Sequence, residues 1–382
     1  MSKKHQKHAK LARPSLGHFH KNEWSIIGTP CSIIQKLADN LASRLNQKYK
    51  VAYVDADHKA FDESNKDALH PYNMVYTDKI DYNRFDTHQA FSKYTFPSYF
   101  REMDMVLVNG NHFEGKHQIV VLDAKKEASL SRKLKRLTNV ASFVTTDSVQ
   151  EPYDFLKQHL PNWENIPVFS IKEVDGIADF IAEKQKNNIP KIKGLVLAGG
   201  KSVRMGQDKG LINYHGTPQR DYAAQLLSQF CEDVYISCRP EQIGEIKSSY
   251  PSLADSFLGL GPMGAILSAF RSDPESAWLV VACDLPLLEH QSIEQLIVER
   301  NISKTATAFL NPDSGFPEPL ITLWEPRSYP TTLQFLAQGY SCPRKVLINS
   351  DVEVIAAKNL DWLTNVNSPE EKEGLLKRLK ND

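Results

Sequence analysis

The sequence predicts an α/β protein of two domains, each built on a mainly parallel sheet that is flanked by helices. The chain has 382 residues, and at roughly 100–200 residues per domain this length favours two domains. Strand-like apolar runs alternate with amphipathic helix-like runs in both halves, which is typical of parallel sheets. A polar segment with one proline, residues 183–194, lies between the halves and predicts a linker.

We expect three parts along the chain. Residues 1–21 are basic and rich in histidine and predict a flexible arm, residues 22–186 a first domain, and residues 187–382 a second. The arm has no hydrophobic core and is therefore no secretory signal. No apolar run approaches the roughly 18 residues of a transmembrane helix, so we expect a cytoplasmic protein.

Charge and cysteine content narrow the function classes. The 46 basic and 46 acidic residues give no net charge, so no global field favours nucleic acid or a membrane surface. Any anion must be bound at a local site. The five cysteines are odd in number and form no CxxC pair, which favours free thiols in a reducing compartment over disulfides or zinc.

In the first half, short apolar runs predict strands and one amphipathic run predicts a helix. The strands are expected at 24–28, 51–57, 103–110, 140–147 and 166–171, and the helix at 32–45. Strands separated by helices indicate a parallel sheet.

The second half repeats this alternation. Strands are expected at 194–200, 233–239, 277–288, 305–310 and 319–324, and helices at 219–230, 263–272, 292–300 and 368–380. The last helix has a good start signal, because Ser368 as N-cap is followed by Pro369 and by Glu371 three residues beyond the cap.

The stretch LVLAGGKSVRMGQDKG, residues 195–210, joins a buried strand to a glycine-rich, charged loop. Parallel sheets bind ligands at the carboxyl ends of their strands. Gly199 and Gly200 let backbone N–H groups approach an anion closely, and Arg204 and Lys209 add positive charge. The loop therefore predicts a site for a nucleoside triphosphate, although it lacks the Walker spacing GxxxxGK[ST].

Asp284 is the second candidate from the residues alone. It ends the buried run AWLVVAC, and the hard cation Mg²⁺ prefers carboxylate and phosphate oxygens. The alternative is that Asp284 caps a helix that begins near Pro286.

The 195–210 stretch resembles the signature LAGGxSxRMGxDK of the nucleotidyltransferases, and within that superfamily it is most similar to the molybdenum cofactor guanylyltransferases. Four later segments are similar to segments of the same family, in the same order. They are ADSFLGLGPMGAI at 254–266, VVACDLPLL at 280–288, GFPEPLITLW at 315–324 and NVNSPEE at 365–371.

This resemblance implies a Rossmann-like nucleotidyltransferase domain. It implies Mg²⁺-dependent transfer of a nucleoside monophosphate, GMP from GTP, to molybdopterin, with release of pyrophosphate. Arg204 and Lys209 would hold the phosphates and Asp284 the metal. It places Leu197, Ala198, Gly199, Gly200, Ser202, Ser237 and Asp255 on the nucleotide, and Gly261, Asn365 and Asn367 on the acceptor.

Some positions depart from the family pattern. Ser237 stands where some members have Asn, Glu318 where others have His, and Gln219 and Arg220 where an apolar residue is usual. Three alternatives stay open: CTP as the donor, a sugar phosphate as the acceptor, or a non-catalytic cofactor-binding scaffold. The protein partner would be a second copy of this chain or a molybdoenzyme maturation protein.

The first half resembles the GTP-binding molybdopterin guanine dinucleotide adaptor, a P-loop protein. Gly28 and Thr29 match its Walker loop, but Pro30 and Cys31 stand where Gly and Lys belong. Pro30 removes one N–H donor, so the resemblance implies a degenerate P-loop domain. Cys31 at a helix start could be a nucleophile, but no histidine lies at a spacing that predicts a base, and we expect a buried or loop-lining thiol.

Overall fold

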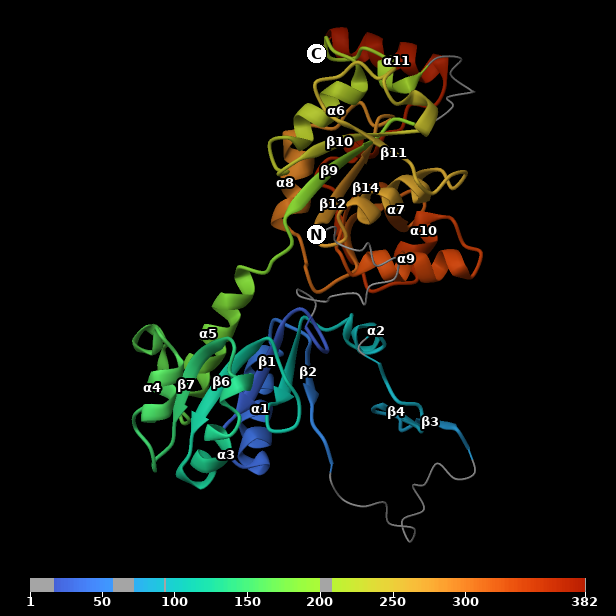
Figure 1. Cartoon of the computed structure of the whole chain (residues 1–382). Coiled ribbons are helices and arrows are strands. Elements are labelled where there is room, and N and C mark those ends of the chain that lie inside the picture. The colour runs from blue at the N-terminus through green and yellow to red at the C-terminus, as the bar shows by residue number, and fades with distance from the viewer. Residues whose placement is uncertain (1–16, 58–71, 93, 200–207, 382) are drawn as a thin grey trace, which may run out of the picture. The chain divides into compact units, whose positions relative to one another are not determined.

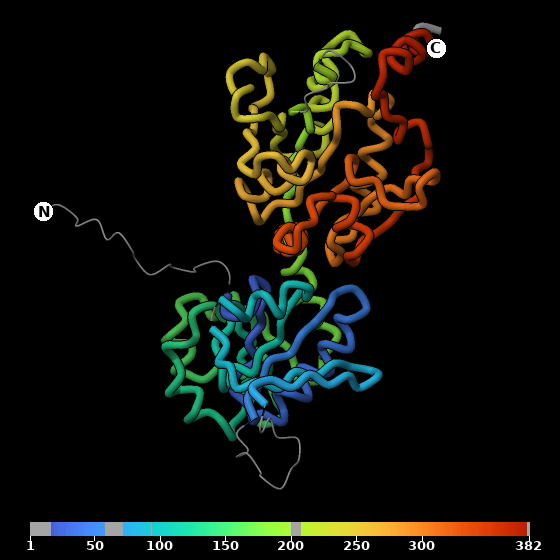
Figure 2. The backbone as a smooth tube through the Cα atoms, turned by 90° about the vertical axis from the view of Figure 1, so that its right-hand side faces the viewer, coloured from blue at the N-terminus to red at the C-terminus, as the bar shows by residue number. Residues whose placement is uncertain are grey.

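The computed structural model describes residues 17–57, 72–92, 94–199 and 208–381. The chain divides into two compact units, residues 1–188 and 189–382. The blue-to-green chain forms the first unit and the yellow-to-red chain the second (Figure 2), so each unit is continuous in sequence. Residues 1–16, most of the predicted arm, lie outside the described residues.

The first unit is built on a six-stranded sheet in the order β2-β5-β1-β6-β7-β8 (Figure 1). All five neighbouring pairs are parallel. The strands are β1 (Glu23–Ile27), β2 (Val51–Val54), β5 (Met105–Asn109), β6 (His117–Leu122), β7 (Val140–Thr145) and β8 (Val168–Ser170). The apolar runs of the sequence predicted all of these strands except β6.

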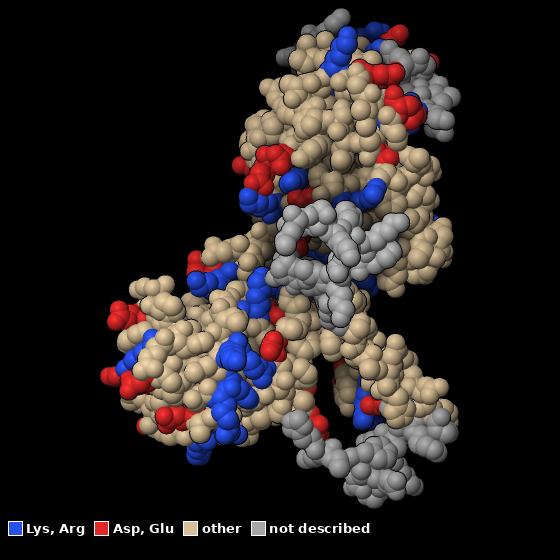
Figure 3. All heavy atoms as spheres, in the orientation of Figure 1, with Lys and Arg blue, Asp and Glu red and all other residues tan. Residues whose placement is uncertain are grey.

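Helices cover both faces of this sheet. Apolar residues of α1 (Cys31–Leu45) recur at helical spacing and pack on one face together with α5 (Val174–Lys186). The other face is covered by Leu130 of α3 (Glu127–Ser131) and Leu156 of α4 (Asp154–His159). Lys and Arg side chains gather on the face of this unit that carries α3 and β6 (Figure 3).

Two strands of the first unit stay outside its main sheet. β3 (Met74–Asp78) and β4 (Asn83–Thr87) pair antiparallel as a separate ribbon. Tyr76 and Phe85 contact each other on the ribbon and are more than half exposed. The short helix α2 (Phe96–Phe100) follows and packs against Phe19.

The second unit has a seven-stranded sheet in the order β11-β10-β9-β12-β14-β13-β15. β14 runs antiparallel to both of its neighbours, β12 and β13, whereas the other pairs are parallel. The strands are β9 (Ile192–Leu197), β10 (Val234–Cys238), β11 (Ser252–Ala254), β12 (Ala277–Ala282), β13 (Ala306–Asn311), β14 (Phe316–Trp324) and β15 (Glu353–Ala356).

Two separate apolar clusters cover the faces of this second sheet. α6 (Gln219–Leu227) and α8 (His290–Val298) contribute to one cluster, and α7 (Pro262–Ser272), α9 (Ser328–Ala337) and α10 (Pro343–Ile348) to the other. α11 (Pro369–Asn381) is the last helix. The predicted fold class is thereby confirmed for both units. Within the described part of the chain, no helix is long and apolar enough to cross a membrane.

Candidate functional site

The candidate site lies where the central parallel strands of the second sheet end. Leu197, the last residue of β9, is in register with Ser237 of β10 on one side and with Ala282 of β12 on the other. The segments that follow these strands therefore meet at one edge of the sheet. Ala198 and Gly199 follow β9, and Asp284 follows β12.

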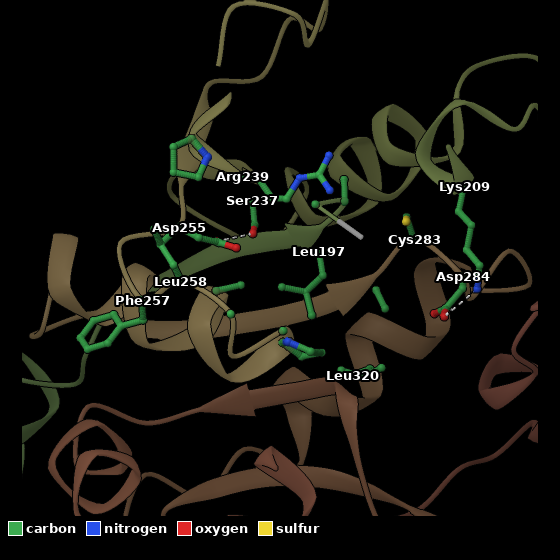
Figure 4. Close-up of a pocket in the computed structure, with 18 of the residues that line it drawn as sticks. Leu197, Lys209, Ser237, Arg239, Asp255, Phe257, Leu258, Cys283, Asp284 and Leu320 are labelled. Carbon is green, nitrogen blue, oxygen red and sulfur yellow. Dashed lines mark hydrogen bonds and ion pairs between the residues drawn. The ribbon is translucent and has the colours of Figure 1, made fainter. Parts of the chain in front are cut away.

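A cavity of about 640 Å³ opens at this edge (Figure 4). The Ser237–Asp255 pair lies at one side of it, the Lys209–Asp284 pair at the other, and Leu197 between them. The predicted site residues that line the cavity are Leu197, Ala198, Gly199, Lys209, Ser237, Asp255, Gly261 and Asp284. The structure thus brings together residues from most of the second unit.

Lys209 and Asp284 form a charge pair. Nζ of Lys209 lies 3.5 Å from Oδ2 of Asp284 and donates a hydrogen bond of 2.6 Å to Oδ1 of Asn367. Lys209 starts a short 3₁₀ turn that Asp208 caps by accepting from the Gly210 N–H at 2.9 Å. The turn fixes the stem of Lys209, so its ammonium is held at the end of the cavity.

The carboxylate of Asp284 lies in a largely buried environment. Burial raises the pKa of Asp284, and the neighbouring Lys209 ammonium opposes this rise. The Oδ1 atom is buried and has no hydrogen-bond partner among the described residues. A buried carboxylate oxygen without a donor is costly, and a hard divalent cation would satisfy it.

The protein supplies few further metal ligands here. Within the described residues, no group of three or more His, Cys, Asp or Glu side chains is placed to hold a metal ion. A cation at Asp284 would therefore take its other ligands from phosphate oxygens and water, as Mg²⁺ does in phosphate-transferring sites. This donor set fits a metal that arrives together with a nucleotide.

The opposite side of the cavity is held by a hydrogen bond between neighbouring strands. The Ser237 hydroxyl donates to Oδ1 of Asp255 at 3.0 Å, and the Asp255 N–H donates to the Cys238 carbonyl. Burial raises the pKa of Asp255, and the bond from Ser237 opposes the rise. Ser237 thus fixes the orientation of a carboxylate that faces the cavity.

The acceptor candidates lie at or beside the cavity, which Gly261 lines. The N–H of Val366 donates to the Asp284 carbonyl at 2.9 Å, which places Asn365 and Asn367 beside the β12 end. Asn365 is half-buried. Gly261 precedes α7 with φ of +56°, a backbone conformation that favours glycine.

Several predicted residues cannot be placed. Gly200, Ser202 and Arg204 lie outside the described residues. Their assigned contacts to the nucleotide therefore stay predictions.

Arg239 was not predicted as a site residue, but it follows β10 and lines the cavity. Its guanidinium pairs with Glu241 at 3.0 Å. The rule that ligands bind at strand ends could have identified it, since β10 was predicted. Glu318 was noted only as a departure, and the structure buries it against Arg344 at 3.0 Å.

The unusual Gln219 and Arg220 at the start of α6 are both buried. Gln219 lies within 3.5 Å of the Leu285 carbonyl, and Arg220 within 3.4 Å of the Lys247 carbonyl. Both side chains thus link the start of α6 to neighbouring segments of the chain.

The loop before α1 in the first unit contains Gly28 and Thr29, the two residues that match the predicted P-loop. Gly28 has φ of +101°, and a Cβ there would lie 2.3 Å from the Val121 carbonyl oxygen. Thr29 donates to Oδ2 of Asp123 at 2.7 Å. Cys31 is partly exposed rather than buried, and its Sγ lies 3.2 Å from Nε2 of His112.

The second unit is similar in sequence to known proteins. The family model described as the MobA-like NTP transferase domain matches residues 194–354. A molybdenum cofactor guanylyltransferase of Pseudomonas putida is 31% identical over 191 residues, which cover 48% of this chain and 96% of that protein. A molybdenum cofactor biosynthesis bifunctional protein of Synechocystis sp. is 41% identical over 179 residues, covering 47% of this chain. The match spans about half (52%) of that relative's length.

Two solved structures are also similar. Molybdopterin-guanine dinucleotide biosynthesis protein A from Archaeoglobus fulgidus aligns with a TM-score of 0.44 and 20% identity, covering 50% of this chain and 100% of that one. A molybdopterin-guanine biosynthesis protein B structure aligns with a TM-score of 0.30 and 20% identity, covering 43% of this chain and 99% of that one.

Proposed function

Because the chain belongs to the molybdenum cofactor guanylyltransferase family, we propose that its second unit transfers GMP from GTP to molybdopterin and releases pyrophosphate. One observation carries this proposal: Lys209, Asp284 and Asn367 meet at the end of a cavity at the carboxyl ends of parallel strands. An ammonium, a carboxylate and an amide at that place suit the triphosphate of a nucleotide and the metal ion bound to it.

The two sides of the cavity suit the two ends of a nucleotide. The Lys209 side carries charge for the phosphates, and Arg204 is expected to add to it. The Ser237–Asp255 side offers a fixed carboxylate to the N–H and O–H donors of a nucleoside. The backbone of Leu197, Ala198 and Gly199 lies between them, with Gly200 and Ser202 expected to continue this contact.

A divalent metal serves nucleotidyl transfer in this family, and we propose Mg²⁺ held by Asp284. When bound, the cation would neutralise phosphate charge and orient the phosphate oxygens. The orphan Oδ1 of Asp284 supports this assignment. Asp284 would be ionised for this role, and its pairing with Lys209 favours the ionised form.

The chain's own residues would bring about transfer mainly by position and charge. A phosphate oxygen of the acceptor attacks the α-phosphorus of GTP, and the bond to the β-phosphate bridging oxygen breaks. Lys209 and Arg204 stabilise the charge that gathers on the leaving pyrophosphate. Gly261, Asn365 and Asn367 would position the acceptor, and the anchoring of Val366 to Asp284 supports the placement of the last two.

The first unit, with the arm of residues 1–21, would support this reaction without hydrolysing nucleotide. Pro30 and Cys31 leave its loop without the lysine that binds phosphates. We propose that it docks the acceptor or joins this chain to a second copy or to a molybdoenzyme maturation protein.

A pyrophosphate-release assay tests the proposal. The full chain is incubated with molybdopterin, Mg²⁺ and each of GTP, CTP, ATP and UTP in turn. Release that needs molybdopterin and is fastest with GTP is expected. Faster turnover with CTP would show that the protein transfers a cytidylyl group. Turnover only with a sugar phosphate in place of molybdopterin would show that the acceptor is a sugar phosphate. Tight GTP binding without turnover would favour the scaffold alternative.

A further inference from the structure

A thiol, an imidazole and a carboxylate meet at the start of α1 in the first unit. Sγ of Cys31 lies 3.2 Å from Nε2 of His112, and the same nitrogen lies 3.8 Å from Oδ1 of Asp55. Cys31 opens α1, His112 follows β5 and Asp55 follows β2. Because β1, β5 and β2 are consecutive neighbours in a parallel sheet, their carboxyl ends bring these three residues together.

The carboxylate of this group is firmly held. Tyr53 Oη donates to Oδ2 of Asp55 at 2.7 Å, and Asn109 Nδ2 donates to Oδ1 at 2.8 Å. Burial alone would raise the pKa of Asp55, but these two bonds, a backbone N–H and His112 together lower it. Asp55 is therefore an anion at neutral pH, and its charge favours the protonated form of the imidazole beside it.

A helix N-terminus and hydrogen-bond donors lie around Cys31. The helix it opens has 15 residues and no side-chain cap, so its first-turn N–H groups and dipole favour an anion at this end. Lys133 Nζ donates to the Asn111 carbonyl at 3.1 Å, and Asn111 Nδ2 lies 3.6 Å from Sγ. Another acid near this loop, Asp123, accepts a hydrogen bond from Thr29.

Other roles for these residues fit the structure less well. A phosphate cradle would need the N–H that Pro30 lacks and a lysine at position 31. The described residues hold no group of three or more His, Cys, Asp or Glu side chains that is placed to bind a metal ion. Cys31 is partly exposed, unlike the buried Cys238 and Cys283, so it is not a core thiol.

We propose that Cys31 and His112 form a nucleophilic thiol–imidazole pair that accepts an acyl group from an activated ester or thioester. Asp55 is a positioning residue that stabilises the imidazolium. This inference concerns the first unit and does not depend on the proposed nucleotidyl transfer.

The acyl step balances with the residues present. The thiol proton moves from Sγ to Nε2, and the thiolate attacks the carbonyl carbon to form a C–S bond. The bond from that carbon to the leaving oxygen or sulfur breaks, and the leaving group takes the proton from His112. An acyl acceptor is favoured over a disulfide because a paired imidazole can protonate a leaving group, whereas disulfide exchange needs only the thiolate.

The test treats the full chain with p-nitrophenyl acetate at neutral pH. We follow p-nitrophenolate release and locate the acetyl group by peptide mass spectrometry. Cys342, which is exposed and belongs to the same molecule, is the internal control. We expect a burst of one equivalent, acetyl on Cys31 well before Cys342, and no burst in Cys31→Ser.

Variants then distinguish a reactive Cys31–His112 pair from a thiol that reacts only because it is accessible. His112→Gln should slow acetylation of Cys31 by about 10²-fold, the lower range of general acid–base contributions. His18→Gln removes a histidine that lies 3.7 Å from Glu114 in the same unit and should change nothing. Asp55→Asn should move the pH profile of iodoacetamide alkylation at Cys31 to higher pH, while circular dichroism verifies folding.

Three results would overturn the inference. Equal acetylation of Cys31 and Cys342 would show an ordinary thiol, and an unchanged rate in His112→Gln would remove the base. Rapid alkylation by iodoacetamide without acetyl transfer would leave a reactive thiolate and refute the acyl assignment.

Discussion

The ammonium of Lys209 and the carboxylate of Asp284 lie 3.5 Å apart at the carboxyl ends of β9 and β12. Asn367, from the segment before the last helix, accepts a hydrogen bond from the same ammonium. One carboxylate oxygen thus faces Lys209, while the other is buried without a hydrogen-bond partner among the described residues. The pair has the form expected of a site that is completed by a metal and a phosphate chain.

Replacing this carboxylate should abolish transfer. Asp284→Asn removes the charge that would hold the cation, and loss of one such preorganised contact costs about 10²–10³ in rate. The measurement is pyrophosphate release from GTP with molybdopterin. Asp313→Asn, in the exposed turn between β13 and β14, is the matched control and should retain full activity.

The same variant should not be less stable at neutral pH. The native pKa of Asp284 is raised above the unfolded value of 3.8, so the native state holds this proton more tightly than the unfolded chain. Stability is therefore lost as pH rises through the native pKa, and Asn avoids that loss. A Tm well below that of the wild type would mean that Asp284 is structural.

Lys209→Met should move the acid limb of the pH–rate profile to higher pH. Burial raises the pKa of Asp284 and Lys209 opposes it, so removing Lys209 leaves a higher pKa. Activity needs the ionised carboxylate and falls as pH drops through that pKa. kcat/KM measured against pH gives the shift, and Lys304→Met, whose ammonium pairs with Asp351 elsewhere, should leave the limb in place.

Ser237→Ala should weaken nucleotide binding more than turnover. The hydroxyl is almost fully buried and fixes the Asp255 carboxylate through a 3.0 Å bond. A hydrogen bond of this kind contributes about 0.5–1.5 kcal/mol, so KM for GTP should rise about two- to tenfold with kcat little changed. Ser228→Ala removes a hydroxyl that bonds the Gln225 carbonyl at the end of α6 and should leave KM unchanged. A fall in kcat alone would contradict the assignment.

Two glycines in helices should respond oppositely to alanine. A Cβ at Gly264 in α7 would lie 2.2 Å from the Phe257 carbonyl oxygen, whereas one at Gly374 in α11 meets nothing within 4 Å. Gly264→Ala should cost about 1–3 kcal/mol through overpacking, and Gly374→Ala should stabilise by about 0.5–1 kcal/mol. Urea unfolding of both variants measures the difference, and equal effects would contradict the close packing at Gly264.

Strand direction in the second sheet could have been predicted but was not. The apolar pattern gives a strand its position but not its direction, so β14 was expected only as one more strand. Residues 312–315 are all that separate β13 from β14. A parallel crossover needs a dozen or more residues, so this short turn already required an antiparallel pair.

Two other features could not have been predicted from the sequence. None of the residues of the β3–β4 ribbon is buried, so neither strand contributes a face to a core. His112 and Cys31 are far apart in the chain and meet only because β1 and β5 are neighbours in the sheet. Spacing can predict a ligand pair on one helix, but a pair formed across a sheet depends on strand order.

The last prediction is that the first unit does not hydrolyse GTP. In P-loop enzymes a lysine neutralises the β- and γ-phosphates, and the loop N–H groups cradle them. Here Cys31 takes the position of the lysine and Pro30 lacks an N–H. The full chain with GTP and Mg²⁺, but without molybdopterin, should therefore release no inorganic phosphate, which is measured separately from pyrophosphate. The double variant Pro30→Gly, Cys31→Lys restores both groups on an otherwise unchanged loop and should gain GTP binding. Steady phosphate release by the unaltered chain that persists in the Lys209→Met variant would show that the first unit is an active GTPase.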